Sequence, residues 1–577
     1  MRFKTGIILI LFFTIHLCGS SILRAQKSPE AYRQGIEFIE EGDSLKGLSM
    51  WEENIQYNSQ NFDPRISFKF IEIVTESKKY SYYQKASETY LKAWNQNNID
   101  LGKWVDVYEQ ELARLKPIVE TNRYKRWEKL LEKEDSVLLS EVKGFWVEKD
   151  LTPTQPGNER LLEHWERIAF ARKKFTLNKD TVYGTDDRGV IYVRYGEPTR
   201  KEEGILTFDE GMASYWISTL LEYRTIVYGT SPADIYEQIS NYTQFKVRKL
   251  SRFNFKPKYE VWIYNSFNTK RDDLLILFGD RPHGGFSKLK APDDLINPGA
   301  FYDVDRSRRF SIPGGLVYQL LYYEQLRNVH YLFEDRYLSI LNKFEFQAGS
   351  TDRMTAKIMR FKNESEFMFM EEEFPREGTS YIREGLNTPV KLGYYRTLRK
   401  NNLPQVLLVN YVQTQSAIEH WAFYDKKVLP NRAFYLKNTL QFFDENWTKK
   451  ADFSVRSDIK SSHFSSFDEP EFNRTTFEVP YLNYLKKGRL KIASELYVKN
   501  RSSEIDTSSN SILPQNLISS NTQTVLFPEP LSTDTSKLEI SDLIIGFESD
   551  DDTKINERIP FVTHPQNKIP DDENLHL

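Results

Sequence analysis

Residues 183–198 read YGTDDRGVIYVRYGEP: a polar turn, then an apolar run, then a glycine and a proline. The run 190–195 consists almost entirely of β-branched and aromatic residues, which favour strands. We therefore predict a strand over 190–195 that is buried on most of both faces, with the polar turn 183–189 leading into it. Glycine and proline end this strand at 196–198.

The region 26–142, before this segment, has helical periodicity. Apolar side chains recur at helix spacing, for example at Tyr32, Ile36 and Ile39. Breaks containing glycine, Asp-Pro or several asparagines divide the region into helices of two to four turns. This pattern is typical of antiparallel helix pairs of the tetratricopeptide kind. An irregular helical bundle explains it equally well.

The central region, 143–348, mixes helical and strand signals. Asn158 is expected to cap the helix that follows it. The segments 259–264 and 274–278 are rich in β-branched and aromatic residues and are joined by a polar turn, so they predict a hairpin. Helical signal returns over 316–344. This region is therefore predicted to be an α+β domain.

The C-terminal region consists of short strand-like segments separated by polar turns, such as 406–412 and 490–498. This arrangement predicts one or two β-sandwich-like modules over 349–500. The stretch from Asn500 to Asn521 is rich in Ser, Thr and Asn, so residues 501–530 are interpreted as a linker or long loop. Strand signal resumes in 531–577, which we interpret as a β segment of a truncated module. The predicted fold class is multidomain: an N-terminal α-helical bundle, a central α+β domain and C-terminal β-sandwich-like modules.

The N-terminus has the features of a secretory signal peptide. Arg2 and Lys4 precede an apolar stretch, 7–17, that is shorter than the ~20 residues a membrane-spanning helix needs. A basic start followed by a short apolar core is typical of an export signal. Cleavage is expected after Ala25, so residues 1–25 form the signal peptide. No later segment has the length and apolarity of a membrane span, so no transmembrane helix is expected after cleavage.

Cys18 is the only cysteine of the chain. Cleavage before Cys18 would allow a lipid anchor there, but Leu17 is larger than the residue that lipidation requires at that place. Loss of Cys18 with the signal peptide is the simpler interpretation. The mature chain would then have no cysteine, which excludes disulfides, thiol catalysis and thiolate metal sites.

The charge balance and the absence of several sequence motifs exclude some classes of function. The chain has 79 lysine and arginine residues against 82 acidic residues, so it offers no concentrated positive field for nucleic acid. We find no phosphate-binding glycine loop, no HExxH and no Gly-x-Ser-x-Gly elbow. We therefore expect no nucleic-acid partner, no metal and no cofactor, and we assign no catalytic residue.

Residues 145–198 contain a series of characteristic residues in a fixed order. They are Phe145, Trp146, Asp150, Thr152, Pro153, Asn158, Glu159, Glu163, Arg167, Thr185, Asp186, Arg188, Gly189, Ile191, Tyr192, Tyr195, Gly196, Glu197 and Pro198. With the strand 259–264 and the loop at Gly284 and Gly285, this segment resembles the GWxTD domain family of envelope proteins from Bacteroidota and Acidobacteria. The likeness extends from Gly144 to about Leu289.

The chain departs from this family at its name-giving pair. The family's Gly-Trp falls on Val182 and Tyr183 here. Tyrosine preserves an aromatic side chain, whereas the loss of the glycine puts in doubt any role that needs a positive φ at that position. The resemblance implies a location in the cell envelope. It implies no activity, because the family has none established.

Five polar residues around the predicted strand are candidate ligand-binding residues, namely Asp186, Arg188, Arg194, Glu197 and His283. The first two lie where the strand begins, the next two where it ends, and His283 lies in a loop rich in glycine and proline. A ligand site would bring them together, since binding residues are common on loops that a rigid scaffold positions.

The alternative is that these residues have structural roles and form hydrogen bonds or ion pairs with neighbouring groups. Asp186 would then cap its turn, and Arg188 would pair with an acid such as Glu159 or Glu163. Arg194 lies in an apolar run and would need an ion-pair partner or a polar cleft.

The sequence therefore predicts an exported protein, periplasmic or associated with the outer membrane. The favoured function is a non-catalytic binding or scaffold protein that contacts another envelope protein through its helical pairs and β modules. The alternative is a periplasmic hydrolase acting on envelope glycan or peptide, with its site in the central domain. Convergence of the polar residues on one pocket would favour the hydrolase.

Overall fold

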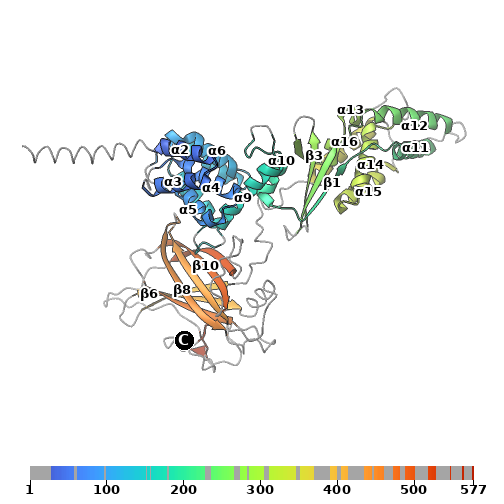
Figure 1. Ribbon diagram of the computed structural model, residues 1–577. Helices are drawn as coiled ribbons and strands as arrows, with labels where there is room; N and C mark the ends of the chain where they lie inside the picture. Colours follow the sequence, from blue (N-terminus) through green and yellow to red (C-terminus); the bar gives the residue numbers. More distant parts are fainter. Residues whose placement is uncertain are drawn as a thin grey trace, which may run out of the picture. The chain divides into compact units, whose positions relative to one another are not determined.

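In the computed structural model (Figure 1), the chain forms two compact units. The described residues are 28–57, 62–96, 99–150, 152–155, 157–177, 181–227, 236–265, 273–281, 285–303, 311–345, 351–368, 390–398, 404–413, 434–444, 447–459, 472–480, 488–500, 517–527, 546–547, 562–563 and 575–576. The predicted signal peptide, Cys18 and His283 lie outside them.

The first unit combines residues Met1–Leu112, Asn122–Glu166 and Glu384–Leu577, and the second combines Ala113–Thr121 with Arg167–Arg383. Residues 143–166, which the sequence assigned to the central domain, therefore group with the N-terminal helices. Within the described residues, no helix is both long enough and apolar enough to cross a membrane.

The N-terminal region is helical, as predicted. Its elements are α2 (Ser28–Glu40), α3 (Ser44–Tyr57), α4 (Pro64–Glu76), the 3-10 turn η1 (Tyr80–Tyr82), α5 (Tyr83–Ala93), the 3-10 turn η2 (Gly102–Trp104), α6 (Val105–Leu115), α7 (Thr121–Glu132), α8 (Val137–Lys149) and α9 (Glu159–Lys174). The predicted cap of α9 is confirmed, because the Asn158 side chain accepts a hydrogen bond from the Leu161 N–H at 2.8 Å.

Helices α2 and α3 form an antiparallel pair whose close contact depends on glycine. Trp51 of α3 is fully buried and donates its indole N–H to the Ala31 carbonyl of α2 at 3.0 Å. Gly35 faces the Trp51 ring, and a Cβ at Gly35 would overlap it. A Cβ at Gly47 would lie 2.8 Å from the Gly35 carbonyl oxygen. The chain therefore places glycine where the two helices touch.

Aromatic side chains fill the core under α4 and α5. Phe68 lies with its ring centroid 5.3 Å from Tyr90 and 5.7 Å from Trp94. Trp94 in turn contacts Tyr108 at 5.0 Å. Edge-to-face and tilted rings at these separations attract one another beyond the area they bury. Tyr90 also contacts Trp146 of α8, so α8 belongs to the same core.

The second unit packs helices against an antiparallel sheet. Its helices are α10 (Asp187–Tyr195), α11 (Glu210–Val227), α12 (Tyr236–Ser251), η4 (Pro292–Leu295), α13 (Pro298–Phe301), α14 (Gly314–Leu326), α15 (Tyr331–Glu345) and α16 (Thr351–Met368). Its sheet has the order β1-β2-β3-β4, with β1 (Arg200–Ile205), β2 (Lys258–Asn265), β3 (Asp273–Arg281) and β4 (Gly285–Leu289). The predicted hairpin is confirmed, because β2 pairs with β3 antiparallel and Tyr259 lies opposite Gly279.

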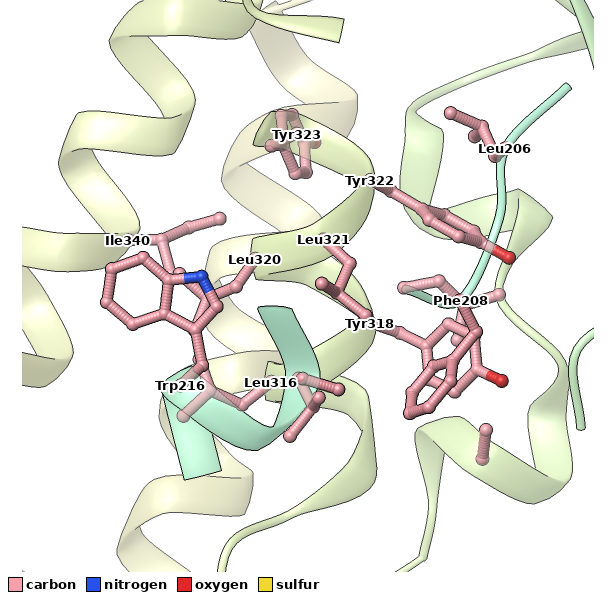
Figure 2. Close-up of a cluster of buried hydrophobic side chains, with 14 of the residues drawn as sticks. Leu206, Phe208, Trp216, Leu316, Tyr318, Leu320, Leu321, Tyr322, Tyr323 and Ile340 are labelled. Carbon is pink, nitrogen blue, oxygen red and sulfur yellow. The ribbon is translucent and has the colours of Figure 1, made fainter. Parts of the chain in front are cut away.

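Helix α14 is the centre of this unit. Figure 2 shows Tyr318 and Tyr322 pointing toward Phe208 and Leu206, while Leu316 and Leu320 point toward Trp216 and Ile340. Because its side chains are buried on all sides, α14 lies inside the core. Together with α15, it confirms the helical signal predicted over 316–344.

The predicted strand over 190–195 is wrong: these residues belong to helix α10. Local signals at both ends outweigh the β preference of the run, which is weak and depends on context. The Asp186 side chain caps the helix by accepting from the Arg188 N–H, and Gly196, with φ of 75°, ends it. The new strand starts only at Arg200.

The C-terminal region is rich in strands, as predicted. One sheet has the order β11-β10-β7-β8, with β7 (Phe434–Phe443), β8 (Lys449–Ile459), β10 (Gly488–Asn500) and β11 (Leu517–Phe527). A second has the order β5-β6-β9, with β5 (Val390–Leu398), β6 (Pro404–Gln413) and β9 (Phe472–Pro480). A third joins the short strands β13 (Val562–Thr563), β12 (Gly546–Phe547) and β14 (Leu575–His576).

Two predictions for this region need correction. Residues Leu517–Phe527, assigned to a linker, form β11, whose polar side chains did not signal a strand but whose backbone pairs with β10. Residues Thr351–Met368, assigned to a β module, form helix α16. Ile358 and Phe361 of α16 are buried in the core of the second unit at helical spacing.

Candidate functional site

Asp186 and Arg188 meet at the start of α10, as the sequence suggested. The Asp186 carboxylate accepts the Arg188 backbone N–H at 3.0 Å, which caps the helix. The same carboxylate accepts the Arg188 side chain through Nη2 at 2.7 Å and through Nε at 3.1 and 3.2 Å. This two-pronged geometry is the strongest form of an arginine–carboxylate pair.

Arg188 also reaches the sheet of the second unit. Its Nη1 donates to the Glu260 carboxylate on β2 at 2.9 Å. Glu260 is 2% exposed and accepts from the Trp262 indole N–H at 2.6 Å. Lys201 of β1 lies 2.8 Å from the other Glu260 oxygen. We call Asp186, Arg188, Lys201 and Glu260 the Arg188 cluster.

Aromatic rings and backbone groups enclose Arg188. Its guanidinium carbon lies 4.1 Å from the ring centroid of Phe286 and 5.0 Å from that of Phe175. Cations are attracted to the faces of such rings. The Phe286 N–H donates to Asp186 at 3.2 Å, and the Lys288 N–H donates to Asp187 at 2.8 Å. Strand β4 is therefore bonded to the first turn of α10.

The pKa shifts in the Arg188 cluster favour the charged forms. Burial raises the pKa of Glu260, but hydrogen bonds from Lys201, Trp262 and Arg188 together outweigh burial and hold it below its ordinary 4.5. Burial lowers the pKa of Lys201, but its bonds to Glu260 reverse the effect and raise it. Glu260 therefore stays ionised at neutral pH, and its charge is matched by Arg188 and Lys201 inside the cluster.

Arg194 and Glu197 lie at the other end of α10. Arg194 lies six positions after Arg188 in the helix, a rise of about 9 Å along the axis. The Arg194 side chain lies over the Tyr195 ring, with 4.8 Å between its guanidinium carbon and the centroid. The Arg194 carbonyl accepts from Arg167 at 3.2 Å, and Glu197 follows the helix-ending Gly196.

The structure thus brings together two of the five candidate residues. Within the described part of the chain, the acids paired with Arg188 are Asp186 and Glu260, so the predicted partners Glu159 and Glu163 are wrong. Sequence reasoning missed Glu260. A signal for it exists, because Glu260 is an acid inside the apolar strand KYEVWIYN and a buried charge needs a partner.

The polar groups of the Arg188 cluster form hydrogen bonds and ion pairs that join helix α10 to the sheet. Carboxylate oxygens of Asp186 and Glu260 receive hydrogen bonds from arginine, tryptophan and backbone donors. Among the residues that the structure describes, no group of three or more histidines, cysteines or acids has the geometry to hold a metal ion. Comparisons with known protein families, curated proteins and solved structures found no match to this chain.

Proposed function

We propose that this chain is an exported cell-envelope protein that binds a partner and acts as a non-catalytic scaffold. The observation that carries the proposal is the internal pairing of the Arg188 cluster. Its polar groups bond α10 to β2 and β4, so their charges stabilise the fold. A hydrolytic site would need acids and bases aimed at a substrate.

The modular architecture supports the proposal. The pair α2–α3 is consistent with a tetratricopeptide-like arrangement, in which helix pairs offer a surface to a partner. The two larger C-terminal sheets are consistent with sandwich-like modules. The GWxTD resemblance and the features of residues 1–25 support the proposed location in the envelope, in the periplasm or at the outer membrane.

The hydrolase alternative has less support from the geometry. It requires Asp186, Arg188, Glu197 and His283 to share one pocket. Asp186 and Arg188 lie at the first turn of α10, whereas Glu197 lies beyond its last turn. Asp186 and Arg188 are also bonded to each other, to Glu260 and to the Phe286 N–H, which supports a structural role for both.

Export is tested by the N-terminus of the protein isolated from cell envelopes. Mass spectrometry should find a chain that starts at Gln26. A lipid-modified N-terminus at Cys18 would support the envelope location and correct the cleavage site. An intact Met1 on a protein recovered from the cell interior would reject the proposal.

Partner binding is tested by cross-linking the tagged full chain in intact envelopes. Leu45 and Tyr57 are 52% and 78% exposed on the helical part, and Tyr236 is 63% exposed on α12. We expect Leu45→Glu with Tyr57→Glu to abolish a discrete cross-linked species, and Tyr236→Glu to preserve it. Absence of any discrete species with the parent chain would contradict the scaffold proposal.

A further inference from the structure

Helix α12, which packs beside α11 in the second unit (Figure 1), ends in a segment rich in cations. Residues 238–259 contain no aspartate or glutamate. They contain six basic residues: Lys246, Arg248, Lys249, Arg252, Lys256 and Lys258. The charges of the whole chain nearly cancel, so this segment is a local exception to the overall balance. A concentration of one sign of charge attracts partners of the opposite sign.

Two of the six cations are bound to an acid that lies after α13. The Asp303 carboxylate lies 2.5 Å from Nζ of Lys246 and 2.5 Å from Nζ of Lys249. Lys246 is 1% exposed, so its charge is matched inside the protein. These two lysines therefore have a structural role, because they join α12 to the residues that follow α13.

The other four cations are exposed and have no such partner. Within the part of the chain that the structure describes, no acid forms an ion pair with Arg248, Arg252, Lys256 or Lys258. Arg248 lies in the last turn of α12, where the helix dipole favours a cation. Lys256 and Lys258 lie beyond the helix, so the dipole does not account for them. Their charges are available to an anionic partner.

Two phenylalanine rings are exposed among these cations. Phe245 is 49% exposed and Phe255 is 46% exposed. Phe245 and Arg248 are three residues apart on α12, and Arg252 follows one turn later, so the three share one face. A phenylalanine ring has no hydrogen-bonding group, and its removal from water is favourable. A matching partner therefore offers an apolar layer next to its negative charge.

The turn that carries Phe255 and Lys256 is fixed by its own contacts. Lys256 has φ of 51°, which is uncommon for a residue with a side chain. The Asn254 side chain accepts the Lys256 N–H at 3.2 Å. Phe253 packs against Gly299, where a Cβ would lie 2.8 Å from the Phe253 ring. The turn therefore anchors Phe253 and leaves Phe255 exposed.

We propose that this segment docks the second unit on an anionic lipid bilayer. The docking residues, which we call the α12 surface, are Phe245, Arg248, Arg252, Phe255, Lys256 and Lys258. The four cations neutralise lipid phosphates, and the two rings enter the boundary between headgroups and acyl chains. A bilayer offers negative charge with hydrocarbon directly beneath it, whereas duplex DNA offers the charge but keeps its bases stacked inside.

The inference is independent of the protein partner proposed above, because the α12 surface includes neither Leu45 nor Tyr57. Its test measures binding of the processed chain to vesicles. This chain starts at Gln26, so the apolar stretch 7–17 is absent and cannot itself insert. One kind of vesicle contains equal parts of phosphatidylglycerol and phosphatidylcholine, and the other contains phosphatidylcholine alone.

Flotation measures the bound fraction at about 0.1 M and about 1 M salt, which changes the screening of charge. We expect binding to the anionic vesicles at the lower salt, weaker binding at the higher salt, and much weaker binding to phosphatidylcholine alone. A parent chain that binds neither kind of vesicle at the lower salt, or both kinds equally, would overturn the proposal.

Matched charge variants assign the binding to the α12 surface. Arg248→Gln with Arg252→Gln removes two cations, and each loss should lower the partition coefficient about fivefold. Arg33→Gln with Arg126→Gln removes the same charge from exposed positions of the first unit and should bind like the parent. Equal losses in the two double variants would show a general charge effect and refute the assignment.

A fluorescent label distinguishes a bilayer from a soluble polyanion. The processed chain has no cysteine, because Cys18 precedes Gln26, so Gln244→Cys beside Phe245 gives one site for a polarity-sensitive fluorophore. We expect a blue shift of its emission with anionic vesicles, and no shift for the same label at Leu45→Cys. Vesicle binding without a blue shift at position 244 would contradict insertion of the rings. Tighter binding of duplex DNA than of anionic vesicles would make nucleic acid the partner and reject the bilayer.

Discussion

Arg188 shows how a single residue connects several elements of the second unit. It pairs with the acid that caps its own helix and with an acid on β2, and it lies between the rings of Phe175 and Phe286. The cap by Asp186 was predictable, because it lies two residues from Arg188 in a polar turn. The pairing with Glu260 was not, because the two residues are 72 positions apart.

Replacing Arg188 should destabilise the second unit. Arg188→Met retains much of the side-chain volume but leaves the buried Asp186 carboxylate without its arginine and Glu260 with Lys201 as its remaining cation in the Arg188 cluster. We expect a loss of about 3–5 kcal/mol in the free energy of unfolding, measured by denaturant titration. Arg360→Ala, which removes an exposed ion pair with Glu364, is the control and should cost less than about 1 kcal/mol. Equal losses in the two variants would argue against the Arg188 cluster.

Glu260 should contribute to the acid sensitivity of the protein. Its folded pKa lies below 4.5, so its stabilising contribution is present above that pH and is lost as the pH falls through the folded value. In Glu260→Gln this contribution is absent. We expect the free energy of unfolding of the variant to fall less than that of the parent between about pH 6 and pH 3. Identical slopes would show that Glu260 ionises normally in the folded protein.

At the scale of elements, α10 shows the limit of strand propensity. Its sequence has the composition of a strand and its buried residues even alternate, yet Asp186 and Gly196 define a helix of nine residues. Arg167 supports the C-terminal end by donating to the carbonyls of Val193 and Arg194 at 3.3 and 3.2 Å. Capping at both ends therefore decided the element.

Gly196 should be far less replaceable than a glycine of similar φ in open space. Gly196 has φ of 75°, and a Cβ there would lie 2.9 Å from Arg167 Nη2. Gly184 has φ of 71° with no atom within 4 Å of its Cβ position. We expect Gly184→Ala to cost about 1–2 kcal/mol from backbone strain alone. Gly196→Ala should cost more, because it also displaces Arg167, and thermal unfolding measures both.

At the scale of the whole molecule, the chain forms two compact units with separate cores. Proteins with several cores commonly depart from two-state unfolding. We expect two transitions by calorimetry. Trp94→Ala, at a fully buried position of the first unit, should reduce the free energy of unfolding of that unit by about 3–5 kcal/mol and lower the temperature of one transition. Arg188→Met should lower the temperature of the other transition. If each variant shifts both transitions, the two units unfold together.

The amino-acid sequence by itself determined the helical N-terminal region, the cap at Asn158, the β2–β3 hairpin and the strand-rich C-terminal region. These features depend on side-chain periodicity and on contacts within a few residues, which a linear pattern contains. Only the tertiary structure decided that Glu260 binds Arg188 and that Glu495 binds Thr154. Those outcomes depend on partners tens to hundreds of residues away, because a buried charge is stable only beside the groups that the complete fold brings to it.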